Sequence, residues 1–162
     1  MNETDTFLPR HLVPELEDAI ASARVVNLIG PRQVGKTTLV RDLFGQGRFI
    51  TLDDAAILAA INADPEGQLA SLMEDLKQAP LIIDEAQNLT PKQMKTLITR
   101  AGPGTKMVCL GNVAQIDTPY LTETSSGITY VVDHFKNWKY GGHMKLHRGE
   151  RSRLADFASD NL

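Results

Sequence analysis

The feature that most constrains this fold is a loop at residues 30–38, which fits the pattern G-x-x-x-x-G-K-S/T. It follows directly on the apolar run 25–29, and apolar residues at helical spacing follow it at 39, 40, 43 and 44. Strand, loop and helix in this order form a phosphate-binding unit of α/β proteins. The alternative, a purely structural glycine turn, does not explain the Lys-Thr pair that closes the motif.

Backbone N–H groups and a helix N-terminus make such a loop a site for phosphate groups. We therefore expect it to hold a nucleoside triphosphate. Lys36 is expected to reach the outer phosphates, and the Thr37 hydroxyl is expected to ligate Mg²⁺. The residues expected to bind the nucleotide are Gly30, Pro31, Arg32, Gln33, Val34, Gly35, Lys36, Thr37 and Thr38.

Two consecutive carboxylates, Asp84 and Glu85, end a second apolar run that begins at residue 81. Where a chain leaves a sheet, neighbouring side chains point in different directions. We expect Asp84 to bind Mg²⁺, directly or through water, while Glu85 acts on the attacking water. A solvated acidic turn is the alternative, and the phosphate loop upstream disfavours it.

Five short apolar runs alternate with helical patterns along the chain, which predicts a parallel sheet covered on both faces, a three-layer α/β fold. The runs lie near 25–29, 48–52, 80–84, 106–111 and 143–147. Helices are expected from Pro14, over 55–76 with a break at 64–67, from Thr90, and from Ile128 to Trp138, with a last one from Ser152.

Composition fits one domain over residues 1–162, with a helical lead-in at 1–23. The chain has 162 residues, 42% of them apolar, enough to bury a core. No apolar run is long enough to span a membrane, and the first residues lack the features of a signal peptide, so a cytoplasmic protein without membrane partners is expected. The single cysteine, Cys109, lies in an apolar run and is interpreted as a small core residue.

Polar residues also follow the second and fourth runs. Asn112 and Gln115 would face the γ-phosphate if their strand lies beside the one that feeds the loop, so they are candidate sensors. An ordinary polar turn is the alternative. Asp53 and Asp54 are interpreted as capping residues of the next helix.

Two families are similar to different parts of the chain. Segments 9–16, 30–38 and 49–54 resemble the AAA-type ATPase domain of a group of prokaryotic ATP-binding proteins. From about residue 81 onward, segments 84–91, 99–102, 115–121 and 148–155 resemble PhoH-like ATPases, relatives of superfamily 1 helicases. PhoH-like proteins usually have Asp where this chain has Asn112, and their interval between the lysine and the acidic pair is longer.

These resemblances imply a P-loop NTPase with strand order 5-1-4-3-2 that hydrolyses ATP with Mg²⁺ through a catalytic glutamate. The PhoH-like resemblance also implies that Arg151, with Arg148 and Arg153 nearby, reaches the γ-phosphate of a neighbouring subunit in a homo-oligomer. Solvated arginines, or Arg32 in this role, are the alternatives.

Two further functions stay open. One is a motor that depends on single-stranded RNA or DNA, which the net charge of -3 does not favour. The other is a nucleotide-dependent switch or scaffold with negligible turnover.

Overall fold

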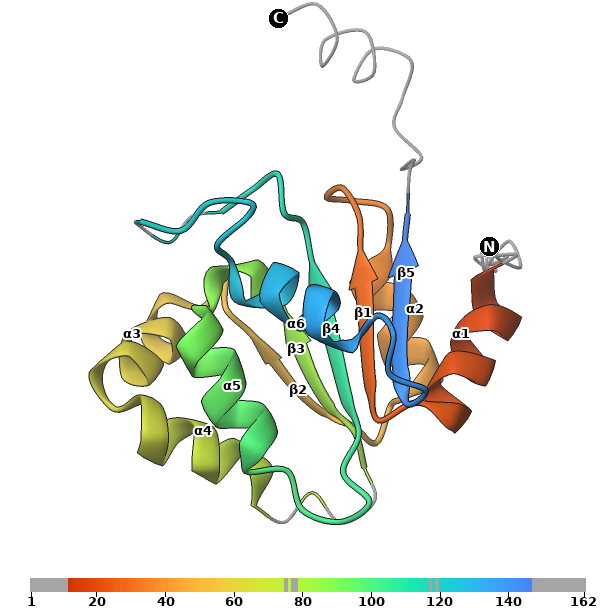
Figure 1. Ribbon diagram of the computed structural model, residues 1–162, viewed down its shortest axis with the longest axis horizontal. Helices are drawn as coiled ribbons and strands as arrows, with labels where there is room; N and C mark the ends of the chain where they lie inside the picture. The colour runs from red at the N-terminus through yellow and green to blue at the C-terminus, as the bar shows by residue number, and fades with distance from the viewer. Residues whose placement is uncertain (1–11, 75, 77–78, 117, 119, 147–162) are drawn as a thin grey trace, which may run out of the picture.

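The computed structural model describes residues 12–74, 76, 79–116, 118 and 120–146. Its centre is a five-stranded sheet in the order β2-β3-β4-β1-β5, in which every neighbouring pair is parallel (Figure 1). This confirms the order 5-1-4-3-2, seen from the other edge. The strands are β1 Val25–Ile29, β2 Arg48–Thr51, β3 Leu81–Asp84, β4 Met107–Gly111 and β5 Gly141–Lys145.

Helices connect the strands as the periodicity predicts. They are α1 Leu12–Ser22, α2 Lys36–Leu43, α3 Ala55–Ala63, α4 Pro65–Met73, the short 3-10 helix η1 Ala86–Asn88, α5 Pro91–Thr99 and α6 Gly127–Phe135. Capping residues set several of the boundaries. Asp64 accepts a hydrogen bond from the Gly67 N–H at the start of α4, so the predicted break at 64–67 is confirmed.

Two apolar cores, one on each face of the sheet, make the fold three-layered. Helices α3, α4, α5 and α6 pack on one face with Leu81 and Cys109, and α1 and α2 pack on the other with Ile82 and Leu28. Successive strand residues belong to opposite cores because side chains alternate along a strand. Both faces are covered, which explains the nearly continuous apolar and buried residues of the three central strands, β1, β3 and β4.

Several predicted boundaries are wrong: α1 begins at Leu12 rather than Pro14, and α4 ends at Met73 rather than at residue 76. The last strand begins at Gly141, two residues before the predicted start, because it pairs with β1 through Val25↔Gly141 and onward. Glycine has a low strand propensity, so only the neighbouring strand reveals this start. Helix α6 ends at Phe135 and does not continue to Trp138. The helix expected from Ser152 lies outside the described residues, as does the first part of the lead-in.

No helix within the described part of the chain is long and apolar enough to cross a membrane. The carboxyl ends of β1, β3 and β4 meet at one edge of the sheet (Figure 1). The N–H of Gly30 donates to the carbonyl of Gly111 at 3.0 Å, so the start of the loop is attached to the end of β4. This edge carries the candidate site.

Candidate functional site

The loop at 30–38 leaves β1 and turns into α2, as its sequence predicts. Two residues in it have left-handed backbone angles, Gln33 with φ 61° and Gly35 with φ 74°. Glycine adopts this conformation without steric cost, whereas glutamine does so at a cost. The turn places Lys36 at the first position of α2.

Lys36 is folded back onto the loop. Its Nζ donates to the carbonyl of Gly30 at 2.8 Å and to that of Pro31 at 2.7 Å, and the residue is 5% exposed. Burial lowers the pKa of Lys36, while the charges of Glu85 and Asp84 raise it less strongly. An anion that binds in the loop would compete with these two carbonyls for the ammonium group.

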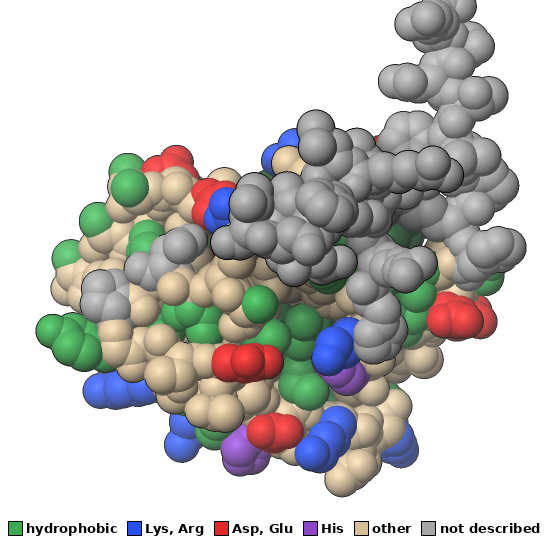
Figure 2. All heavy atoms as spheres, turned by 90° about the horizontal axis from the view of Figure 1, so that it is seen from above, with side chains coloured by type: hydrophobic (Ala, Val, Ile, Leu, Met, Phe, Trp, Pro, Cys, Tyr) green, Lys and Arg blue, Asp and Glu red, His purple; other side chains and the backbone are tan. Residues whose placement is uncertain are grey.

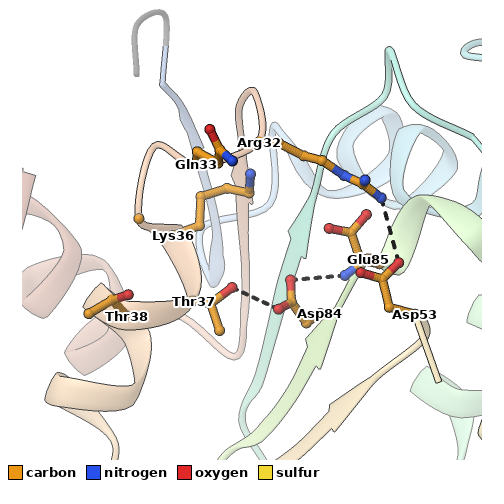
Figure 3. A pocket seen from close by; sticks show the side chains of 9 residues that line it. Arg32, Gln33, Lys36, Thr37, Thr38, Asp53, Asp84 and Glu85 are labelled. Atoms are coloured by element: carbon orange, nitrogen blue, oxygen red, sulfur yellow. Dashed lines mark hydrogen bonds and ion pairs between the residues drawn. The ribbon is translucent and has the colours of Figure 1, made fainter. Parts of the chain in front are cut away.

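The Asp84 carboxylate joins the two halves of the site. The Thr37 hydroxyl donates to its Oδ2 at 2.7 Å, and the Glu85 N–H donates to its Oδ1 at 3.0 Å (Figure 3). The predicted Mg²⁺ ligands, Thr37 and Asp84, are therefore in contact. They fit the cation, because Mg²⁺ usually takes only one or two protein oxygens and completes its shell with water and phosphate. The described residues hold no group of three or more acidic, His or Cys side chains that could bind a metal by themselves.

Glu85 has a strained backbone and is 8% exposed. Its φ of 57° and ψ of 36° are left-handed, which is uncommon for a residue with a side chain. Such strain persists only where surrounding structure imposes it, and it is frequent at functional sites.

These groups surround a cavity of about 350 Å³, a size typical of ligand pockets. Its lining residues are Arg32, Gln33, Gly35, Lys36, Thr37, Thr38, Asp53, Asp84 and Glu85. Among the residues predicted to bind nucleotide, Gly30, Pro31 and Val34 do not line it. The carbonyl oxygens of Gly30 and Pro31 instead accept hydrogen bonds from Lys36.

Asp53 was interpreted as a capping residue, and that interpretation is wrong. Asp54 is the cap, accepting hydrogen bonds from the N–H groups of Ala56 and Ile57. Asp53 lines the cavity and forms an ion pair with Arg32 at 3.6 Å, with both side chains about half exposed (Figure 3). The only signal for it in the sequence is its place after the second strand, at the same edge as the loop.

Asn112 and Gln115 lie together but do not line the cavity. The Asn112 Nδ2 donates to the Gln115 Oε1 at 2.9 Å. Both residues connect to Glu85 through Gln87, which was not predicted as a site residue. A polar residue two positions after the acidic pair, in an otherwise buried stretch, is the signal that would have found it. The role of Asn112 and Gln115 as sensors of the γ-phosphate stays a prediction. Arg151, predicted to act in trans, lies outside the described residues.

Comparisons with known proteins agree with this geometry. The family model described as PhoH-like protein matches residues 74–156, about half of the chain. "Protein PhoH2" of Bacillus subtilis (strain 168) is 52% identical over 82 residues, 51% of this chain and 19% of that protein. A "PhoH-like protein" of the same organism is 57% identical over 44 residues, 27% of this chain and 14% of that protein. The chain thus spans about a fifth or less of the length of these relatives.

Among solved structures, Pif1 helicase from Candida albicans is similar with a TM-score of 0.57 at 14% identity, covering 96% of this chain and 43% of that one. Unliganded Pif1 from Bacteroides sp. is similar with the same score at 16% identity, covering 94% and 44%. At such identities the likeness shows the fold. Fold, loop geometry and family match together show that the chain belongs to the PhoH-like family of P-loop nucleotide-binding proteins.

Proposed function

We propose that this chain binds ATP and hydrolyses it with Mg²⁺. The observation that carries the proposal is the contact between Thr37 and Asp84 at 2.7 Å, beside Lys36 and Glu85 in one cavity. A hydroxyl on the phosphate loop and a carboxylate at the end of a neighbouring strand are the pair that holds Mg²⁺ in P-loop NTPases. When bound, the cation neutralises charge on the β- and γ-phosphates.

In this proposal each residue has a separate role. The backbone of the loop and the start of α2 bind the phosphates. The ammonium of Lys36 leaves the carbonyls of Gly30 and Pro31 and stabilises the charge that develops on the transferring group. Glu85 accepts a proton from the attacking water, which it orients in line with the leaving oxygen.

Two variants test the proposal. Lys36→Ala should abolish the rise in melting temperature that ATP and Mg²⁺ cause in the wild type, because the cation facing the outer phosphates is lost. Glu85→Gln should keep that rise and lower phosphate release about 100-fold or more, the effect of losing a positioned proton acceptor. If Lys36→Ala still shows the ATP-induced rise in melting temperature, the proposed phosphate site is wrong. If Glu85→Gln releases phosphate at the wild-type rate, another group is the base.

A nucleic-acid-dependent motor is the second candidate, favoured by the likeness of the fold to that of Pif1 helicase. The charge does not favour it: on the part of the face in Figure 2 that is not drawn in grey, acidic and basic side chains are interspersed, and the whole chain carries -3. The phosphate-release assay repeated with single-stranded RNA or DNA distinguishes the two. Stimulation that falls with added salt supports the motor.

The same assay distinguishes the remaining possibilities. Tight ATP binding without phosphate release would indicate a switch or scaffold. A specific activity that rises with protein concentration, together with rescue when Arg151→Ala and Lys36→Ala subunits are mixed, would support a homo-oligomer with Arg151 acting in trans.

A further inference from the structure

The side-chain amide of Gln87, next to the site, makes three hydrogen bonds. The residue lies in η1 and is 0% exposed. Its Nε2 donates to the Glu85 Oε2 at 2.5 Å and to the carbonyl of Gln115 at 2.9 Å, and its Oε1 accepts from the Asn112 N–H at 3.1 Å. Both N–H groups of the amide and its oxygen are therefore used.

The contact with Gln87 involves only one of the two carboxylate oxygens of Glu85. Oε2 is held by Gln87, whereas the other oxygen, Oε1, accepts no hydrogen bond from the residues that the structure describes. Glu85 also lines the cavity. A carboxylate with one oxygen held and one unengaged is restricted in rotation, which is how a third group orients a catalytic base.

The other two contacts of Gln87 reach the end of β4. Gly111 makes room for the amide: a Cβ at this glycine would lie 2.9 Å from the Gln87 Oε1 and 2.8 Å from Ile128. The Gly111 carbonyl in turn accepts from the N–H of Gly30, the first residue of the phosphate loop. A short series of hydrogen bonds thus connects the loop, the end of β4 and Glu85, and Gln87 is its centre.

We propose that Gln87 is a positioning residue for hydrolysis: it orients the Glu85 carboxylate and connects it to residues 112–115 at the end of β4. The inference rests on the proposed ATPase function. It also assigns a role to Asn112 and Gln115 that does not need them in the cavity, because they act on Glu85 through the Gln87 amide.

Gln87→Met tests this, since methionine has a similar length and no N–H to donate. With ATP and Mg²⁺, kcat should fall about 10- to 100-fold, the range for a displaced catalytic group, while the Kd for ATP stays at the wild-type value. Gln93→Met is the matched control. Gln93 is a second buried glutamine, 8% exposed, that bonds to Asn62 and to the start of α5, away from the cavity. It should lose stability and keep kcat.

A double-mutant cycle separates positioning from general structural support. In single-turnover assays on the Glu85→Gln background, Gln87→Met should cause no further loss, because the group that it orients is already disabled. A further loss of the same factor would overturn the inference, as would an unchanged kcat in Gln87→Met. If Gln87→Met does not fold, Gln87→Asn, which keeps the amide but is too short to reach Glu85, decides between the same outcomes. A wild type that binds ATP without hydrolysing it would instead refute the proposed function.

Discussion

At the scale of residues, the charged groups of the site already have partners within the protein. Lys36 donates to two carbonyls, Asp84 accepts from Thr37, and Arg32 lies 3.6 Å from Asp53. Buried polar groups need such partners, because an unpaired one costs about 1–3 kcal/mol. Ligand binding at this site is therefore an exchange of partners, and the protonation state of Lys36 influences that exchange.

Burial lowers the pKa of Lys36 below its ordinary value of 10.5, so the amine of the free protein loses its proton at a lower pH than an exposed lysine does. In the proposed complex, the phosphates of ATP would favour the charged form of Lys36 and raise its pKa again. We therefore expect the affinity for ATP to fall as the pH rises through the lowered pKa, with proton uptake on binding in that range. Calorimetry in buffers of different ionisation enthalpy measures both quantities.

Lys36→Arg is the control for this titration, since a guanidinium stays charged over the whole range. Whatever its absolute affinity, this variant should show no proton uptake at alkaline pH. An affinity of the wild type that is independent of pH up to 10.5 would contradict the lowered pKa.

At the scale of elements, end groups determine where the helices begin. Helix α5 begins with a capping box: the Thr90 hydroxyl accepts from the Gln93 N–H at 3.1 Å, and the Gln93 Oε1 accepts from the Thr90 N–H at 2.9 Å. The pattern Thr-Pro-x-Gln is visible in the sequence, so this boundary could be predicted from local chemistry alone. The helix that it starts places Met94 and Leu97 in the core beside the site.

Thr90→Ala should lower the free energy of unfolding by about 1 kcal/mol, because the N–H groups at the start of α5 lose their acceptor. Urea unfolding followed by circular dichroism measures the change. Thr99→Ala is the matched control on the same helix, since the Thr99 hydroxyl donates only to carbonyls of its own last turns, Lys95 and Thr96. Equal losses in the two variants would contradict a specific contribution of the cap.

At the scale of the whole molecule, the accessibility of Cys109 shows whether the helices stay packed on the sheet. The residue lies in β4 with 0% exposure, and burial raises the pKa of its thiol to about 12. The interpretation of Cys109 as a small core residue is confirmed. The reactive thiolate is therefore scarce at neutral pH, and a reagent reaches the sulfur only when the layers separate.

Alkylation of Cys109 by iodoacetamide at pH 8 should therefore be slow in the native protein and fast in urea. Saturating ATP and Mg²⁺ should slow it further, because a ligand that binds only the folded state reduces the unfolded population. Mass spectrometry over time measures the rate, and Lys36→Ala, which is expected not to bind ATP, is the control for the second effect. Rapid stoichiometric labelling of the native protein would contradict a closed core.

Much of this protein is determined by contiguous stretches of sequence. The loop at 30–38, the acidic pair Asp84 and Glu85, the capping residues and the alternation of strands and helices all depend on neighbours along the chain. Their physical basis is local, namely hydrogen-bonding patterns, permitted backbone angles and apolar periodicity. They were sufficient for the fold class and for most helix and strand positions.

What only the tertiary structure decided depends on which strands lie side by side. Asp53 reaches the cavity, and Gln87 reaches Asn112 and Gln115, because β2, β3 and β4 are adjacent in the sheet although their residues are far apart in the chain. The start of β5 is likewise set by its pairing with β1. Hydrogen bonds between distant residues have no periodic signature, so the sequence shows the groups of the site and the fold decides which of them meet.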